Sequence, residues 1–536
     1  MEGPNSKNME KLNRIINNRN FKLLFLGYIF ICLIVIAFAK PIFCDAQDHA
    51  AQGYAILNGQ WPGIDYMPHS AFLTQYLYYG LFAIIFHMNL FVMRFFSAGL
   101  IFLLIIFLWA TMSRLRYQPL TCVLAVLSLI VPAYFSMFYI EFIHYNLTIA
   151  FLGYAFLSVF YFLRPGLTEK KMVWVVFFIG LLYGISAATR MHIFVMTPVF
   201  MGIVLYRYVS ITGSAPKKSQ LFEAFFVLIL GILAVNIPNI LILARCYSKI
   251  IYSYVEFLPL LFWGWKVYFE NNASILLIDL RELFVFLRDP GNFFIFSLFL
   301  SALYLSILKL IRSLKEKAKF GEKVFFPASC AFFSVVLLAI YWYFGMFRYY
   351  YSHLLFIWAC ASIMVFDYLI ESKKVWHVFA LRFIVICALL GAAAFGARAA
   401  VYALRYKDSD STIGAYYEAA KLIKKYTKPD DVVLAATAMP VVLSGRKPYH
   451  NNGFPRSAFY WHCLKADTPA KAITVYPKTI FSKAVFLDDI EKGNISYMLM
   501  DVQLRDIGYT FDLPSVIKKF KLLDKANGFE LYIKQE

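Results

Sequence analysis

The sequence predicts a mainly α-helical, polytopic membrane protein with about eleven transmembrane helices, outer-face juxtamembrane helices and a small C-terminal extracytoplasmic α/β domain. Three observations predict this fold class. Of the 536 residues, 61% are hydrophobic and only 16% are charged, which is too little polar surface for a soluble protein. Apolar runs of about 20 residues, long enough to cross roughly 30 Å of hydrocarbon, recur along most of the chain. The chain becomes polar only near its C-terminus.

The apolar runs and the charges between them predict a topology. The candidate spans are 21–43, 90–112, 119–137, 147–164, 172–189, 191–209, 221–243, 291–311, 325–345, 350–370 and 377–400. Basic residues gather in alternate short loops, so the positive-inside rule predicts a cytoplasmic N-terminus. All these basic loops lie on the cytoplasmic side only if the apolar segment 70–87 does not cross the membrane. We therefore expect that segment to be a juxtamembrane helix in the outer leaflet.

This topology leaves three regions outside the membrane on the outer face. They are a first outer loop at 44–69, a second outer loop at 245–290, and an α/β domain at 405–536 that follows a transmembrane domain at 1–404. In the last region we expect a helix at 413–426, strands at 431–436 and 497–501, a helix near 513–520 and a strand pair ending at 529–533. We expect the first span to remain as an uncleaved anchor.

Composition and motifs exclude several function classes. The net charge of +20 lies in loops between apolar runs, which positive-inside topology explains without nucleic acid. The eight cysteines show neither zinc-ligand spacing nor a disulfide framework. There is no Gly-rich nucleotide-binding motif. No cofactor is expected to be required, although the sequence leaves a divalent cation open.

The first outer loop holds the most informative residues. Asp45 and Asp48 follow the first span, and Ala50, Tyr54 and Leu57 continue at helical spacing. The two acids therefore share one face of a short surface helix. A carboxylate beside apolar protein holds a proton more readily than one in water, which suits a general base. The plain alternative is that these acids only mark an outer loop.

This loop resembles that of the GT-C glycosyltransferases, and within them the protein O-mannosyltransferases and the aminoarabinose transferases of lipid A. The likeness rests on an acid directly after the first span, then Tyr54-Ala-Ile-Leu-Asn-Gly59, then an aromatic, Pro and Asp cluster. It continues in Arg94 at the start of the next span and in Gly184-Ile-Ser-Ala-Ala-Thr-Arg190. The stretch Arg348-Tyr-Tyr-Tyr-Ser-His353 is similar to a basic-aromatic element of that family. In layout, the resemblance covers most of the chain.

The resemblance implies roles for particular residues. Asp45 is the expected catalytic base, with Asp48 second, and Glu141 matches the acid expected in the next outer loop. The family often places an acid next to this Asp, whereas Ala46 follows here, which leaves the choice between Asp45 and Asp48 open. On the same first loop, the resemblance offers Tyr54, Tyr66 and His69 as substrate contacts.

Arginines are expected to bind the phosphate of the sugar carrier. Arg190 lies between two apolar runs, where a cation is costly unless it is paired or faces water. A guanidinium can bind a phosphate through two hydrogen bonds, so we expect Arg190 to bind the leaving phosphate, with Arg348 and His353 on the other side of that site. Snorkelling of Arg190 to lipid headgroups is the alternative, and His192 is expected to be structural.

The sequence thus predicts a multi-pass inner-membrane enzyme that moves a sugar from a polyprenyl-phosphate donor. The acceptor is expected to be lipid A, O-antigen, another glycan or a protein, and no nucleic-acid partner is expected. A transporter or flippase of lipid-linked sugars is the main rival, but it predicts mid-membrane charges and duplicated halves, which the sequence lacks. An O-antigen polymerase or ligase is a second rival, and the polar C-terminal region favours the transferase.

Overall fold

The computed structural model describes most of the chain. The described residues are 4–41, 59, 85, 89–140, 144–212, 217–251, 275–316, 321–344, 348–372, 374–405, 412–435, 437–449, 483–501, 504 and 513–535. The chain forms two compact units. The first contains residues 1–37, 95–236 and 275–401, and the second contains 38–94, 237–274 and 402–536.

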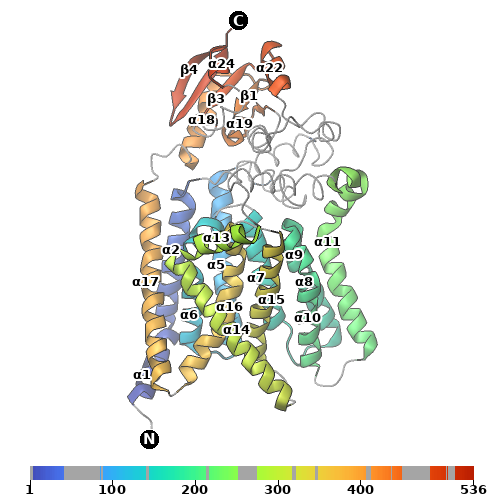
Figure 1. The fold of residues 1–536 in the computed structure, drawn as a ribbon, viewed down its shortest axis with the longest axis vertical. Coiled ribbons are helices and arrows are strands. Elements are labelled where there is room, and N and C mark those ends of the chain that lie inside the picture. The colour runs from blue at the N-terminus through green and yellow to red at the C-terminus, as the bar shows by residue number, and fades with distance from the viewer. Residues whose placement is uncertain are drawn as a thin grey trace. The chain divides into compact units, whose positions relative to one another are not determined.

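The first unit is a bundle of apolar helices that run side by side (Figure 1). The long helices are α2 (Arg19–Ala39), α5 (Leu90–Arg114), α8 (Glu169–Thr189), α11 (Lys218–Ile251), α14 (Pro290–Glu316), α15 (Glu322–Phe344), α16 (Ser352–Glu371) and α17 (Val375–Arg405). Each contains a stretch long and apolar enough to cross a membrane. Three shorter apolar helices join them, namely α6 (Pro119–Ile130), α7 (His144–Tyr161) and α10 (Thr197–Ile211). The predicted multi-pass membrane fold is confirmed.

Two of the shorter helices result from breaks in predicted spans. The predicted span 119–137 is α6 followed by one turn of π-helix, η1 (Phe135–Tyr139). Around this break, the Ala133 amide donates to Asp289 Oδ1 at 3.2 Å, and Arg398 Nη2 donates to the Val131 carbonyl at 2.7 Å. The span 191–209 is likewise divided into α9 (Met191–Val195) and α10. At the first break, side chains from Asp289, just before α14, and from Arg398, on α17, thus satisfy backbone groups that the break releases.

Glycines bring α8 and α11 into backbone contact. A Cβ built on Gly180 would lie 2.5 Å from the Leu228 carbonyl oxygen, and one on Gly231 would lie 2.4 Å from the Phe177 carbonyl oxygen. One turn beyond Gly180, a Cβ built on Gly184 would lie 2.9 Å from the Ile232 backbone. Small residues four apart are a common way to pack helices within a membrane. Gly184, quoted above with Arg190, therefore fixes the position of α8 against α11.

Two further helices of this unit lie outside the predicted spans. Figure 1 shows α13 (Ile275–Leu287) lying crosswise at one end of the bundle. It packs on the 3-10 turn η3 (Arg348–Tyr351), within a region expected to be loop. The N-terminal helix α1 (Pro4–Asn17) packs against α6, and Asn13 accepts from the Leu120 amide at 3.3 Å. Neither helix has enough consecutive apolar residues to read as a span.

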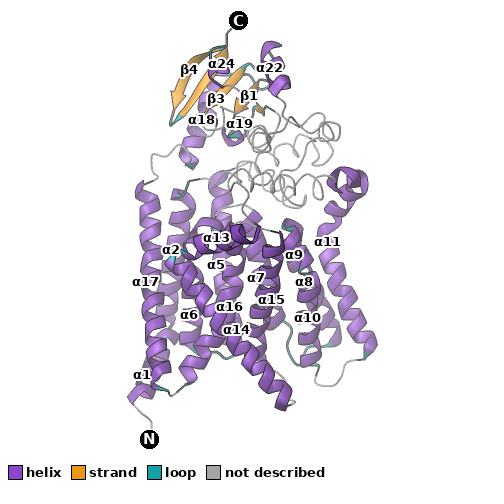
Figure 2. Ribbon diagram, viewed as in Figure 1, coloured by secondary structure: helices purple, strands orange, loops and turns teal. Residues whose placement is uncertain are grey.

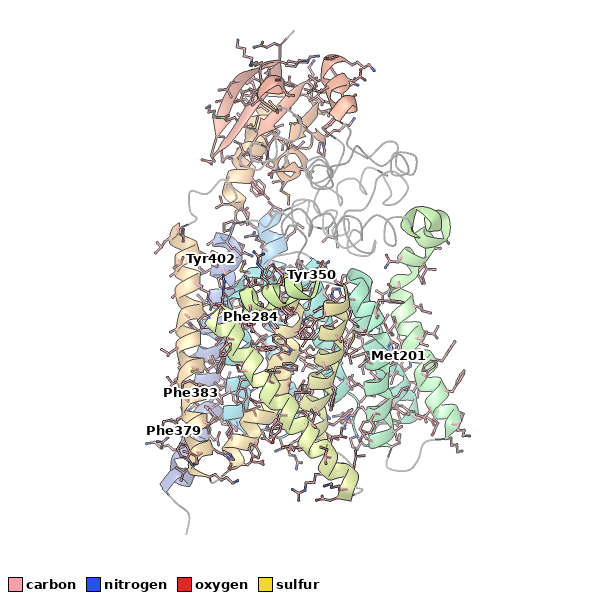
Figure 3. All side chains as sticks on the ribbon, viewed as in Figure 1. Met201, Phe284, Tyr350, Phe379, Phe383 and Tyr402 are labelled. Carbon is pink, nitrogen blue, oxygen red and sulfur yellow. The ribbon has the colours of Figure 1, made fainter. Side chains whose placement is uncertain are left out.

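The side chains on the outside of the bundle are apolar. On α17, Phe379 and Phe383 point away from the neighbouring helices (Figure 3) and are 68% and 62% exposed. Exposed rings and aliphatic chains over the length of a helix are what a lipid-facing surface requires. By contrast, α16 is the most buried of the long apolar helices in the described chain and forms the centre of the bundle.

The C-terminal residues form a small α/β fold, as predicted. Figure 2 shows that the strands are confined to this region among the described residues. They are β1 (Val432–Ala435), β2 (Lys447–Pro448), β3 (Tyr497–Met500), β4 (Phe520–Ala526) and β5 (Phe529–Lys534). The sheet order is β2-β1-β3-β5-β4, with β1 parallel to β2 and β3 and with β5 antiparallel to β3 and β4. The helices are α18 (Ile413–Tyr426), α19 (Ala438–Leu443), α22 (Lys483–Glu491) and α24 (Leu513–Ile517).

The second unit also includes the start of α5. The Leu90 amide donates to the Tyr417 hydroxyl at 3.2 Å, and the rings of Phe91 and Tyr417 stack at 5.8 Å. Helix α18 therefore packs on the first turn of α5. The predicted helix 70–87 lies almost wholly outside the described residues, and the predicted domain division at 404/405 stays a prediction.

Candidate functional site

A single residue separates α8 from α9. Arg190 has extended backbone, with φ −148° and ψ 122°, and its carbonyl accepts from the amides of Ile193 and Phe194 at 3.1 and 3.2 Å. The Tyr183 hydroxyl donates to the Ile193 carbonyl at 2.6 Å, which ties α9 back onto α8. This short turn holds the Arg190 side chain at the end of the bundle, where it is only 6% exposed.

Two tyrosine rings hold the guanidinium of Arg190. Its Cζ lies 4.7 Å from the centroid of Tyr145, at the start of α7, and 5.2 Å from that of Tyr350, in η3. Both distances are within the range of cation–π attraction, which favours the charged form of the arginine. Figure 3 labels Tyr350 at the end of the bundle where α13 lies. Two segments, 45 and 160 residues from Arg190 along the chain, therefore meet on one cation.

Two histidines complete the cluster. The rings of His192, in α9, and His353, in the first turn of α16, lie 5.1 Å apart. His353 stacks on Tyr145 at 5.1 Å, and its Nδ1 lies 3.2 Å from the Tyr341 hydroxyl. The rings of His192 and Tyr341 pack in a T-shaped arrangement, with 5.1 Å between their centroids. We call this set the Arg190 cluster, and its members are Tyr145, Arg190, His192, Tyr341, Tyr350 and His353.

The cluster contains one group with a fixed positive charge, because an arginine keeps its charge in proteins. The described neighbours of this guanidinium include imidazole and phenol groups. Such a set can bind an anion.

The helices around the cluster are joined by buried hydrogen bonds. The Tyr139 hydroxyl, in η1, donates to the Ser352 carbonyl at 3.0 Å and accepts from the Phe356 amide at 2.9 Å. The hydroxyls of Thr148 and Thr189 lie 2.7 Å apart and join α7 to α8. These bonds fix the starts of α7 and α16 relative to Arg190, so the cluster is held by rigid helices.

The described residues also bracket a candidate catalytic acid. The Asn146 side chain is fully buried and donates to the carbonyls of Tyr139 and Ser97. Glu141 itself lies outside the described residues, between Ile140 and His144. Asn146 thus ties the segment before Glu141 to the helix that follows it and to α5.

A second arginine fixes the entrance to the first loop. Arg94, in α5, is 5% exposed and donates from Nη1 to the Lys40 carbonyl at 2.5 Å and from Nη2 to the Pro41 carbonyl at 3.2 Å. These carbonyls follow the end of α2 at Ala39 and lie five and four residues before Asp45. A guanidinium fork suits two such acceptors, so the chain leaves the bundle from a defined point.

The structure brings together part of the predicted site. Arg190 and His353 lie in one cluster with Tyr145 between them. The backbone of Arg348 is in η3 beside them, and its side chain lies outside the described residues. The other predicted site residues also lie outside, namely Asp45, Asp48, Tyr54, Tyr66, His69 and Glu141. Their roles stay predictions.

Sequence reasoning missed four members of the cluster. Tyr145, Tyr341 and Tyr350 are three among 37 tyrosines, and nothing in their spacing indicates a shared cation. For His192 the sequence predicts a structural role, and this stays a prediction. The available signal was its position two residues after Arg190, together with the aromatic residues that precede His353. Among the described residues, no group of three or more His, Cys, Asp or Glu side chains is placed to hold a metal ion.

Comparisons with known proteins identify the fold. No family model and no curated protein matches the sequence. Among solved structures, ArnT from Cupriavidus metallidurans bound to undecaprenyl phosphate is 12% identical, with a TM-score of 0.55, and the match covers 96% of this chain and 98% of that one. The Archaeoglobus fulgidus oligosaccharyltransferase in the apo form is 13% identical, with a TM-score of 0.50 over 96% of this chain and 75% of that one.

A third solved structure agrees with the first two. The Archaeoglobus fulgidus enzyme in complex with Zn and sulfate is 16% identical, with a TM-score of 0.51 over 96% of this chain and 73% of that one. At these identities the likeness concerns the fold. The chain therefore shares the fold of these solved structures, and the resemblance stated from the sequence is confirmed for the fold.

Proposed function

We propose that this chain is an integral membrane glycosyltransferase that moves a sugar from a polyprenyl-phosphate-linked donor to a cell-envelope acceptor by inverting displacement. The observation that carries the proposal is the Arg190 cluster, a buried guanidinium between Tyr145 and Tyr350, within a fold shared with ArnT bound to undecaprenyl phosphate. A phosphate on a lipid is an anion that arrives at the membrane surface. A guanidinium held at one end of a helical bundle suits it.

The reaction requires a base and a charge acceptor. A carboxylate takes the proton of the acceptor hydroxyl or amine while that atom attacks the anomeric carbon. The bond from this carbon to the phosphate oxygen breaks, and its electron pair stays on the phosphate. Arg190 then stabilises the added charge, with help from Arg348 on η3. Asp45 is the proposed base, Asp48 is the alternative, and Glu141 is a second acid of the site.

The contacts of Arg94 and Asn146 support this assignment of acids. Each side chain fixes backbone next to a segment that carries a candidate acid. Tyr54, Tyr66 and His69 are proposed to contact substrate from the first loop. We propose no required cofactor, and because the oligosaccharyltransferase was solved with Zn, a divalent cation is added in one arm of the assay.

We further propose that the enzyme lies in the inner membrane with its N-terminus in the cytoplasm. The C-terminal α/β region and the Arg190 cluster then face outward, where lipid-linked sugars are used. The basic loops between the predicted spans support this orientation. The acceptor is a lipid A, an O-antigen, another glycan or a protein.

The proposal is tested by transfer from synthetic polyprenyl-phosphate sugars in detergent, with and without a divalent cation. Wild type is expected to release polyprenyl phosphate when an envelope extract supplies the acceptor. We expect one of the two variants Asp45→Asn and Asp48→Asn, the one that replaces the base, to lower the rate of sugar transfer at least 100-fold. Full activity in each of the three variants Asp45→Asn, Asp48→Asn and Glu141→Gln would exclude every proposed base. Movement of intact lipid-linked sugar across vesicles without release would favour a flippase instead.

A further inference from the structure

Two adjoining side chains, one on α5 and one on the first turn of α7, each keep a polar atom without a partner. Ser97 Oγ and Asn146 Oδ1 are buried, and no described residue forms a hydrogen bond with either atom. Both residues are 0% exposed. Most buried polar atoms in proteins have a hydrogen-bond partner, so two such atoms in adjoining residues indicate a water or a ligand hydroxyl beside them.

The orientation of the Asn146 amide is fixed by its other contacts. Its Nδ2 donates to the carbonyls of Tyr139 and Ser97, the latter at 3.3 Å. Because a carbonyl oxygen only accepts hydrogen bonds, the amide atom that faces these two carbonyls is the nitrogen. Asn146 Oδ1 is therefore an acceptor on the other side of the amide, and it needs a donor.

The Ser97 hydroxyl differs from several other buried serines of the bundle. Ser128, Ser306 and Ser362 each donate to a carbonyl of their own helix, at 2.7 or 2.8 Å. Ser97 makes no such bond in the part of the chain that the structure describes, so its hydroxyl remains available as a donor. One hydroxyl group of a ligand can donate to Asn146 Oδ1 and accept from Ser97 Oγ, which satisfies both atoms at once.

The position of the two residues indicates which ligand supplies that hydroxyl. Asn146 directly follows Tyr145, whose ring centroid lies 4.7 Å from Arg190 Cζ. Two residues later, the Thr148 hydroxyl lies 2.7 Å from that of Thr189, the residue before Arg190. Consecutive Cα atoms are about 3.8 Å apart, so a sugar joined to a phosphate at Arg190 reaches the first turn of α7.

We propose that Ser97 and Asn146 together bind one hydroxyl group of the sugar that the lipid carrier brings to the site. This inference rests on the proposed function and adds a sugar-binding pair to the same site. The two side chains are uncharged, so they recognise the position of a hydroxyl and not a charge. They thereby contribute to the choice of the sugar that is transferred.

The test is calorimetric titration of the purified protein in detergent with undecaprenyl phosphates that carry a hexose or a pentose. The methyl ester of undecaprenyl phosphate is the reference ligand, because it has the same single charge but no sugar. We expect wild type to bind one of the sugar-linked carriers at least threefold more tightly than the methyl ester. Ser97→Ala should lower the affinity for that carrier about three- to tenfold, as expected for one lost hydrogen bond, and leave the affinity for the methyl ester unchanged.

Ser158→Ala is the matched control. Ser158 is also 0% exposed and its hydroxyl also has no partner among the described residues, but it lies about 18 Å along α7 from Asn146. We expect Ser158→Ala to change neither affinity. Because Ser97 Oγ has no described partner, Ser97→Ala should leave the melting temperature of the ligand-free protein unchanged or raise it, which separates a lost ligand contact from a folding defect.

Deoxy analogues of the preferred carrier locate the contact. Removal of one particular sugar hydroxyl should abolish the difference in affinity between wild type and Ser97→Ala, whereas removal of the others should leave that difference in place. A difference that survives in every analogue would overturn the inference.

The remaining outcomes separate the two proposals. Equal affinity of wild type and Ser97→Ala for every sugar-linked carrier, while Arg190→Gln weakens binding of the methyl ester, would overturn the sugar-binding inference alone and assign the two atoms to a buried water. An equal loss of affinity for the methyl ester and the sugar-linked carrier in Ser97→Ala would also overturn it. If wild type binds none of these phosphates, the lipid-phosphate site itself is wrong, and the inference fails with it.

Discussion

Arg207 Nη1 lies 2.8 Å from Glu322 Oε1, joining α10 to the first turn of α15. The arginine is 2% exposed, whereas the glutamate side chain is 44% exposed. Arg207 also donates to the Leu163 carbonyl, from Nε at 3.2 Å and Nη2 at 2.9 Å. One buried guanidinium therefore ties three helices together at the opposite end of α7 from the Arg190 cluster.

This contact predicts a stability difference between two similar substitutions. Glu322→Gln leaves Arg207 buried without its ion-pair partner, and we expect a loss of about 1–2 kcal/mol, because the glutamate is partly screened by solvent. Glu316→Gln removes a pair with Arg312, whose side chain is 78% exposed, and we expect a change of less than about 0.5 kcal/mol. Thermal unfolding in detergent measures both. Equal effects of the two substitutions would show that Arg207 does not depend on Glu322.

The contact of α8 with α11 predicts an effect of single methyl groups. Gly231→Ala places a Cβ 2.4 Å from the Phe177 carbonyl oxygen, so the helices must move apart. We expect a loss of about 1–3 kcal/mol. Gly202→Ala is the control, because nothing lies within 4 Å of its added Cβ. It should leave stability unchanged or raise it by up to about 1 kcal/mol. A neutral Gly231→Ala would contradict the backbone contact.

Much of the bundle could be predicted because hydrocarbon thickness sets the length of apolar helices. The start of α5 at Leu90 and the end of α8 at Thr189 coincide with the predicted spans. The π-helical turn η1 could not be predicted, since its sequence is as apolar as a continuous helix. The helix α13 was taken for loop because Asp279, Arg281 and Glu282 interrupt its apolar residues.

The site was less predictable than the fold. Arg190 could be chosen because a cation between apolar runs is costly and therefore unusual. Its aromatic neighbours could not be chosen in this way. Tyr145 and Tyr350 are 205 positions apart, and hydropathy does not indicate which helix faces contact each other. Helical spacing relates residues within one element, whereas the cluster is made by packing of five elements.

The contacts of Arg94 predict a change in rate with little change in binding. Arg94→Gln removes the fork that holds the Lys40 and Pro41 carbonyls, so the segment that leads to Asp45 loses its fixed origin. We expect kcat to fall about tenfold or more, because misplaced catalytic groups lose rate steeply. The affinity for carrier phosphate should remain. Arg382→Gln, an exposed position on α17, is the control. A matching loss of carrier affinity would place Arg94 in the phosphate site instead.

The most direct test of the account is binding of undecaprenyl phosphate to wild type and Arg190→Gln, with undecaprenol as the ligand that lacks the phosphate. We expect Arg190→Gln to weaken binding of the phosphate at least tenfold, equivalent to about 1.4 kcal/mol, and to leave binding of the alcohol unchanged. Equal affinity of the two proteins for undecaprenyl phosphate would contradict the assignment of the Arg190 cluster as the carrier-phosphate site.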